Sequence, residues 1–99
     1  MGINLNNDRI NIRVTGMVQG VGYRFACRDQ ARRLGLCGWV RNCADGSVEV
    51  VAEGPSLTLA GLADWCARGP GGAVVRDCRV AHIPAGTPLK FFEIHPTTE

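Results

Sequence analysis

The residues best suited to chemistry lie in one stretch, Gly16–Arg24, where three glycines precede a single arginine. Glycine adopts positive φ without strain and lets other groups approach the backbone, so such a loop can turn several N–H groups toward one point. If a helix begins directly after the loop, its first turn adds unpaired N–H donors and about half a positive charge. Together these features favour the binding of a phosphate-like anion.

Arg24 strengthens this interpretation, because a cation in the first turn of a helix is unfavourable by about 0.3–1 kcal/mol. A residue that breaks a local rule is a candidate for function, and a guanidinium here could donate two hydrogen bonds to a tetrahedral oxyanion. The alternative is a tight strand-to-helix turn with a solvated arginine, and the glycines alone do not decide between the two. No Gly-Lys-Ser/Thr follows and the third glycine of a dinucleotide-binding fingerprint is missing, so neither of those motifs is present.

Asn42 is the second candidate, because it lies near the end of a predicted strand, and asparagine is rare in strands. Its carbonyl could accept a hydrogen bond from water while its NH2 group donates to a ligand. The ordinary alternative is that its side chain starts the turn that Asp45-Gly46 predicts. Taken by itself, Asn42 favours that alternative.

Hydrophobic periodicity predicts the elements that must position these residues. Apolar residues alternate over residues 9–15, which predicts a half-buried strand. Beyond the glycines, apolar residues recur at spacings of four, four and three over residues 23–34, which predicts an amphipathic helix with Gly35 at its C-terminal cap. The glycine loop therefore connects the end of a strand to the start of a helix.

Further strands are predicted over residues 37–43, 47–53, 74–80 and 91–94. A second helix, with Ser56 as its expected cap, should end before Gly69. Within residues 74–80 the apolar positions change phase once, which indicates a β-bulge.

This order of elements, β-α-β-β-α-β plus a short fifth strand, predicts an α+β fold of the ferredoxin-like, split βαβ kind. Right-handed crossovers place both helices on one face of a sheet that we expect to be antiparallel. We expect residues 1–8 to form a flexible N-terminus and residues 9–99 to form a single domain. The fold alone does not decide the function, because it supports enzymes, carriers and RNA-binding modules.

The charge is distributed unevenly along the chain. Residues 1–44 hold seven arginines and two acidic residues, a net charge of +5, whereas residues 45–99 hold four basic and seven acidic residues, a net charge of −3. The positive potential therefore gathers near the glycine loop and suits an anionic ligand. Five cysteines, an odd count without a Cys-x-x-Cys pair or a zinc pattern, argue against a full disulfide framework and indicate a reducing compartment, and the sequence alone leaves one disulfide open. We expect a cytoplasmic monomer, with no membrane span and no signal peptide.

Two long motifs resemble the signatures of the acylphosphatase family. The first is Gly16–Arg24, and the second runs from Gly38-Trp39-Val40-Arg41-Asn42 through Asp45-Gly46 to Gly54, spacing included. Gly69-Pro70 and the final Phe92-Glu93-Ile94 are also similar, so the resemblance covers about residues 9–95. Two independent motifs in the right order make a more specific signal than either motif alone.

The resemblance implies an enzyme that hydrolyses acyl phosphates, with a small-molecule substrate and without a metal or other cofactor. It implies that Arg24 binds the phosphate together with loop N–H groups and that Asn42 positions the attacking water. The phosphate-binding residues it implies are Met17, Val18, Gln19, Gly20, Val21, Gly22 and Arg24.

Two other functions are open to a domain of this kind. One is an RNA-binding module, but the predicted helix over 23–34 lacks interleaved aromatic residues, and we expect no binding of nucleic acid. The other is a related domain that handles carbamoyl phosphate at the front of larger maturation proteins. A chain that stops after one domain favours the free-standing enzyme.

Overall fold

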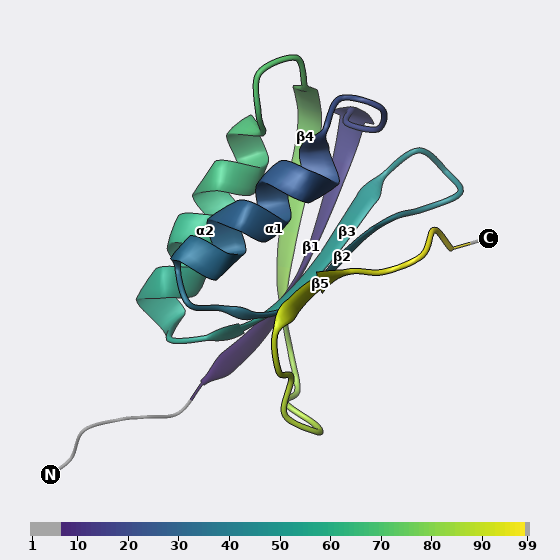
Figure 1. Cartoon of the computed structure of the whole chain (residues 1–99). Helices are drawn as coiled ribbons and strands as arrows, with labels where there is room; N and C mark the ends of the chain where they lie inside the picture. Colours follow the sequence, from purple (N-terminus) through teal and green to yellow (C-terminus); the bar gives the residue numbers. More distant parts are fainter. Residues whose placement is uncertain (1–6, 99) are drawn as a thin grey trace, which may run out of the picture.

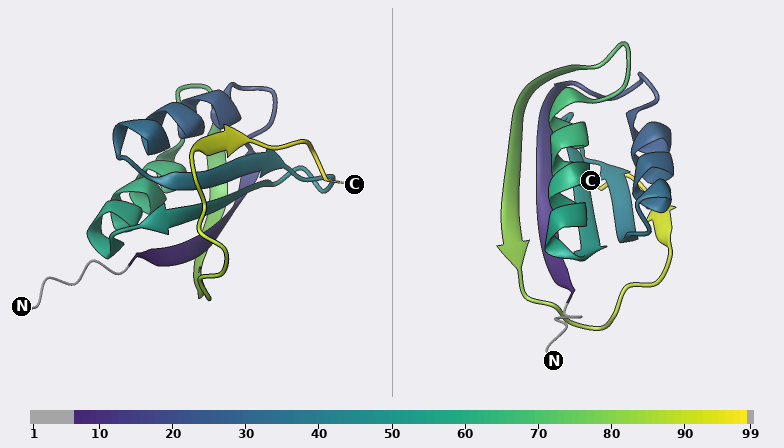
Figure 2. Two further views of the ribbon diagram at one scale, coloured as in Figure 1. Left: turned by 60° about the horizontal axis from the view of Figure 1, so that its bottom comes forward. Right: turned by 90° about the vertical axis from the view of Figure 1, so that its left-hand side faces the viewer.

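The computed structural model describes residues 7–98 and contains five strands and two helices (Figure 1). Their bounds are β1 Asp8–Met17, α1 Tyr23–Arg33, β2 Cys37–Asn42, β3 Val48–Gly54, α2 Ser56–Arg68, β4 Val74–Ile83 and β5 Phe92–Ile94. The strands form one sheet in the order β4-β1-β3-β2-β5, and both helices pack on the same face of it (Figures 1 and 2). The predicted ferredoxin-like architecture is confirmed. Residues 1–6 of the N-terminus expected to be flexible lie outside the described residues.

The expectation of a purely antiparallel sheet is wrong, because β5 pairs with β2 in parallel, from Gly38 opposite Phe92 to Val40 opposite Ile94. The topology explains the difference. β4 runs antiparallel to β1, so it ends at the edge of the sheet where β2 begins. The connecting loop follows that edge to the other side of the sheet, so β5 starts beside the start of β2 and runs with it (Figure 2).

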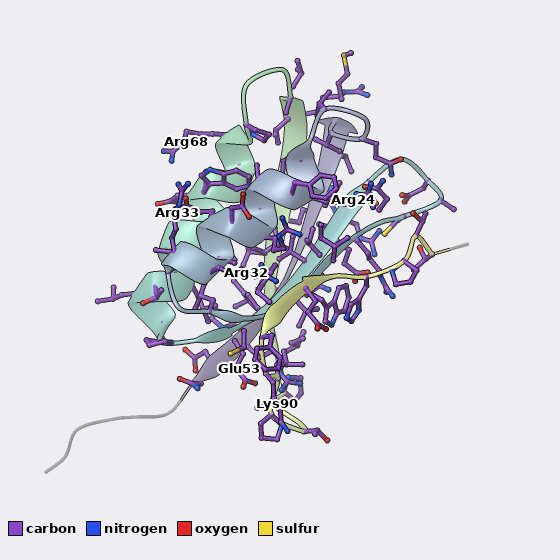
Figure 3. All side chains as sticks on the ribbon, in the orientation of Figure 1. Arg24, Arg32, Arg33, Glu53, Arg68 and Lys90 are labelled. Carbon is purple, nitrogen blue, oxygen red and sulfur yellow. The ribbon has the colours of Figure 1, made fainter. Side chains whose placement is uncertain are left out.

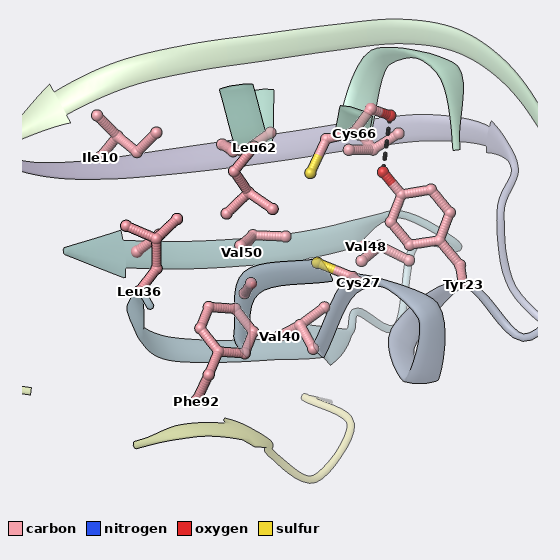
Figure 4. Close-up of a cluster of buried hydrophobic side chains, with 14 of the residues drawn as sticks. Ile10, Tyr23, Cys27, Leu36, Val40, Val48, Val50, Leu62, Cys66 and Phe92 are labelled. Atoms are coloured by element: carbon pink, nitrogen blue, oxygen red, sulfur yellow. Dashed lines mark hydrogen bonds between the residues drawn. The ribbon is translucent and has the colours of Figure 1, made fainter. Parts of the chain in front are cut away.

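The core lies between the sheet and the two helices (Figure 4). Alternate residues of β1 and β3 point into it, as predicted, and α1 and α2 supply the other side. Its strand members include Ile10, Ile12, Val14, Val40, Val48, Val50 and Ala52, and its helix members include Tyr23, Cys27, Ala31, Leu59, Leu62 and Cys66. The Tyr23 hydroxyl donates a 2.7 Å hydrogen bond to the Cys66 carbonyl, which ties the start of α1 to α2. Each large apolar side chain buried here stabilises the fold by about 1.5–3 kcal/mol.

The predicted bulge is confirmed and lies at the start of the glycine loop. Thr15 pairs with Asp77 but Gly16 pairs with Val75, so Arg76 is the extra residue on β4. Gly16 has φ +127, and a Cβ atom there would lie 2.2 Å from the Val74 carbonyl oxygen. Only glycine fits this close approach, which bends the chain as it leaves the sheet.

Ser56 does not cap α2. The helix already includes Ser56, and Pro55 in an extended conformation precedes it as the N-cap. The Ser56 hydroxyl instead donates to the carboxylate of Asp8 on β1. As an N-cap the hydroxyl oxygen would accept from an N–H of the first turn, whereas here the O–H donates to a carboxylate, so this bond joins two elements instead of closing a helix end.

The face of the sheet opposite the helices carries a charged network centred on Glu49. Its Oε1 accepts hydrogen bonds from Arg41 Nε (3.0 Å) and Nη2 (2.8 Å), and its Oε2 accepts one from Asn11 Nδ2 (2.8 Å). Burial by itself raises the pKa of Glu49, but these hydrogen bonds and the charges of Arg41 and Arg13 outweigh it and hold the pKa below its ordinary value.

The lowered pKa makes this stabilisation depend on pH. The stabilisation is present above the pKa of the carboxyl in the unfolded chain, about 4.3, and is lost as the pH falls through its lower pKa in the folded protein. We expect Glu49→Gln to be less stable by about 1–2 kcal/mol near neutral pH and to lose less stability than the wild type across that acidic window. Urea unfolding at several pH values measures this, and parallel curves for the two proteins would contradict it.

Candidate active site

The sheet topology brings the glycine loop and Asn42 to the same end of the molecule. β1 and β2 are both antiparallel to β3, so they run in the same direction and end at the same edge. Val48 lies opposite both Val14 on β1 and Asn42 on β2. Asn42 is therefore two strand spacings, about 10 Å, from Val14, and Val14 is two residues before Gly16, where the glycine loop begins.

Asn42 also lies on the helix-covered face of the sheet. Residues directly opposite one another share a face, and the two neighbours in register with Asn42, Val14 and Val48, are both fully buried under the helices. α1 packs against β2, and Arg24 is the second residue of α1. Figure 3 shows Arg24 at the loop end of α1, far from Arg32 and Arg33 at the other end.

The loop has the conformation that its glycines predict. Gly20 and Gly22 have φ of +76 and +78, and Gly22 is the N-cap of α1. No side chain of the described residues caps the first turn, which contains no acidic residue. Within the part of the chain that the structure describes, no backbone N–H of residues 19–22 donates to another backbone group. Donors of this kind, at a helix N-terminus, suit an anion.

Two side chains fasten the loop in place. Val18 is buried in the core, with 1% of its surface exposed. Gln19 Nε2 donates two hydrogen bonds of 2.9 Å, to the carbonyls of Cys43 and Ser47. Gln19 thus ties the loop to the β2–β3 turn, one residue beyond Asn42. Sequence reasoning missed this role, because it considered only the backbone of the loop.

Met17, unlike the other predicted phosphate-binding residues, belongs to a strand. It is the last residue of β1, pairs with Val74 and exposes 66% of its surface. Its side chain therefore points to solvent, so a contribution to anion binding would come from its backbone.

Asn42 does not make the turn that its position suggested. Asp45 does so instead, because its Oδ1 accepts from the Ser47 N–H (2.9 Å) and hydroxyl (2.6 Å), and these bonds lower the pKa of Asp45. Among the described residues the Asn42 Oδ1 atom is buried and has no hydrogen-bond partner. Such an atom costs about 1–3 kcal/mol and calls for an explanation. The ordinary structural alternative for Asn42 is therefore wrong.

Two other properties of the described residues bear on the class of site. Across residues 7–98, no three His, Cys, Asp or Glu side chains gather in a way that could hold a metal ion. No helix in that part of the chain is long and apolar enough to cross a membrane.

Fold and site together define a ferredoxin-like domain with a glycine loop at a helix N-terminus and, at the same end, a carboxamide acceptor that has no hydrogen-bond partner among the described residues. The sequence profile of the acylphosphatase family matches residues 10–94, and the chain belongs to that family. It is 51% identical over 89 residues to an acylphosphatase of Synechococcus sp. (strain RCC307). This alignment covers 90% of this chain and 75% of the relative. Acyl phosphate hydrolysis is the function of the family, and the chain is an enzyme of this class.

Solved structures agree with this assignment. An acylphosphatase from Coxiella burnetii is 34% identical and superposes with a TM-score of 0.86, covering 91% of this chain and 94% of that one. Full-length HypF, in a phosphate- and nucleotide-bound form, has a TM-score of 0.89 over all of this chain but only 13% of its own. At 22% identity that likeness shows the fold alone.

Proposed function

We propose that the loop N–H groups of residues 17–22 and the Arg24 guanidinium bind the phosphoryl group of an acyl phosphate, and that Asn42 aims a water molecule at its phosphorus. The observation that carries the proposal is the buried Asn42 Oδ1, which has no partner within residues 7–98 and lies on the same face and at the same end as the loop. An acceptor placed in this way orients water through one of the water's protons.

The chemistry of the leaving group explains the small set of residues. A carboxylate leaves, and its conjugate acid has a pKa of about 4, so it departs without a general acid. The two histidines lie elsewhere: His82 is exposed on β4, and His95 stacks on Trp39. Phosphoryl transfer then depends on positioning and on stabilisation of charge, which the loop and Arg24 supply.

In the proposed step the water oxygen forms a bond to phosphorus while the bond from phosphorus to the acyl oxygen breaks. The electron pair of the broken bond leaves with the carboxylate. The proton of the water passes to an oxygen of the bound phosphoryl group, and the products are a carboxylate and inorganic phosphate. The positive charge of Arg24 and the N–H groups stabilise the equatorial oxygens throughout.

We further propose a metal-independent, cytoplasmic monomer that does not bind nucleic acid. The five cysteines are free, which supports a reducing compartment. On α1, Arg28 lies over the ring of Phe25, at 5.4 Å, and Arg32 donates to the Phe92 carbonyl, so these arginines have intramolecular partners.

A rate assay tests the proposal directly. We expect the protein to hydrolyse acetyl phosphate and benzoyl phosphate, and to do so at the same rate with and without EDTA. Carbamoyl phosphate assayed beside them distinguishes the related carbamoyl-phosphate activity. No turnover of acetyl or benzoyl phosphate, or a loss of activity in EDTA that added metal restores, would contradict the proposal.

A further inference from the structure

The backbone of Asn42 is held from both sides, although the sheet itself holds it from only one. On the β3 side, Asn42 pairs with Val48. On the other side, β5 pairs only with Gly38–Val40 and stops two residues short of Asn42. Without another partner, Asn42 would be the last residue of a strand with an open edge, where backbone pairing is weakest.

The segment after β5, residues 95–98, supplies that partner. The His95 N–H donates to the Val40 carbonyl at 2.9 Å, and the Thr98 N–H donates to the Asn42 carbonyl at 3.1 Å. Pro96, which has no N–H, lies between the two donors. Figures 1 and 2 show this segment leaving β5 toward the end of the molecule where the β2–β3 turn lies.

An aromatic stack fixes the start of the segment. The rings of His95 and Trp39 lie 5.2 Å apart at an angle of 13°, and the Arg41 guanidinium carbon lies 4.5 Å from the centre of the Trp39 ring. The side chains of residues 39, 41 and 95 thereby hold the segment against β2. The bond from Thr98 to Asn42 is then formed by a chain that is already anchored.

We propose that residues 95–98 act as a C-terminal strap that positions Asn42 for the attack of water, with Thr98 as a positioning residue. The inference rests on the function proposed above. The Asn42 Oδ1 atom has no partner among the described residues, so the position of the carboxamide depends on packing and on the backbone that carries it, not on a hydrogen bond to Oδ1. A small misplacement of a group that orients a reactant lowers the rate steeply. The phosphate-binding loop should keep its position, because the buried Val18 anchors it in the core and Gln19 also donates to Ser47 on the far side of the turn.

Two substitutions at one position test the strap in the full-length chain. Thr98→Pro removes the N–H donor, and Thr98→Ala is the matched control that keeps it. We expect T98P to lower kcat about twofold to tenfold, the range that corresponds to one net hydrogen bond, and T98A to leave kcat unchanged. The inhibition constant of inorganic phosphate should stay the same in both, because phosphate binds to the loop and Arg24.

A double substitution separates positioning from general stability. In an Asn42→Ala background, T98P should cause no further loss of kcat, because the group that it positions is gone. If T98P does not fold, His95→Ala, with His95→Phe as the control that keeps the stack, replaces it with the same expectations. Full activity of T98P, or an equal loss in both backgrounds, would overturn the strap. Unchanged activity of N42A alone would instead overturn the proposed role of Asn42.

Discussion

Arg24→Ala should lower kcat/KM for acetyl phosphate on the order of 10²–10³-fold or more, the loss seen when one preorganised oxyanion donor is removed. Arg24 lies in the first turn of α1, where a cation is unfavourable for the helix, and no described carboxylate forms an ion pair with it. Its charge is thus available to an anion. The inhibition constant of inorganic phosphate should rise together with the loss of rate.

The stability of the folded protein should not fall in R24A, so thermal unfolding serves as a control for the kinetic result. Thermal unfolding of R24A should match or slightly exceed that of the wild type, because the unfavourable charge at the helix start is gone. Arg24→Lys keeps the charge but not the two-pronged donor, and it should recover only part of the rate. Arg33→Ala, an exposed position on the same helix, should keep full activity. Full activity in R24A would remove Arg24 from the mechanism.

Asn42→Ala should lower kcat on the order of 10²-fold while the affinity for inorganic phosphate stays unchanged, since the phosphate is held by the loop and Arg24. Its stability should equal or exceed that of the wild type, because the substitution removes a buried acceptor that has no partner among the described residues. Steady-state kinetics, phosphate inhibition and thermal unfolding measure the three quantities.

Asn11→Ala is the matched control for Asn42→Ala. Asn11 lies on the opposite face of the sheet, where its Nδ2 donates to Glu49. N11A should lose stability, by about 1 kcal/mol, but not activity. A stable N42A protein with unchanged kcat would contradict the proposed role of the carboxamide, and a loss of phosphate affinity in N42A would reassign Asn42 to binding.

Much of this architecture follows from local patterns in the sequence. Alternation placed β1, the spacing from Tyr23 to Leu34 placed α1, and the phase change in β4 revealed its bulge, because burial imposes these periods on any chain. The direction of β5 did not follow, because a three-residue strand has no pattern that distinguishes parallel from antiparallel pairing. Ser56 misled because the helix begins at Ser56 itself, with Pro55 as the N-cap, and its hydroxyl donates to Asp8, which is distant in sequence.

Two parts of the site could be predicted from the sequence: the loop whose N–H groups suit an anion, and the residues within the two motifs. Glycines and an arginine indicated an anion, and the family resemblance assigned a role to Asn42. The bonds that hold the site together were not predictable: Gln19 to the β2–β3 turn and Thr98 to Asn42 span 24 and 56 residues of sequence. Contacts between residues so far apart in sequence depend on the tertiary fold. Neither a glutamine in a loop nor a threonine near the C-terminus indicates such a contact by its residue type.

Titration of the ¹⁵N-labelled protein with inorganic phosphate tests the central claim most directly. The account predicts that the largest and saturable shifts fall on the backbone N–H groups of residues 18–24, that they persist in N42A, and that they vanish in R24A at the same phosphate concentration. Shifts centred on α2 or β4, or loop shifts that survive in R24A unchanged, would contradict it.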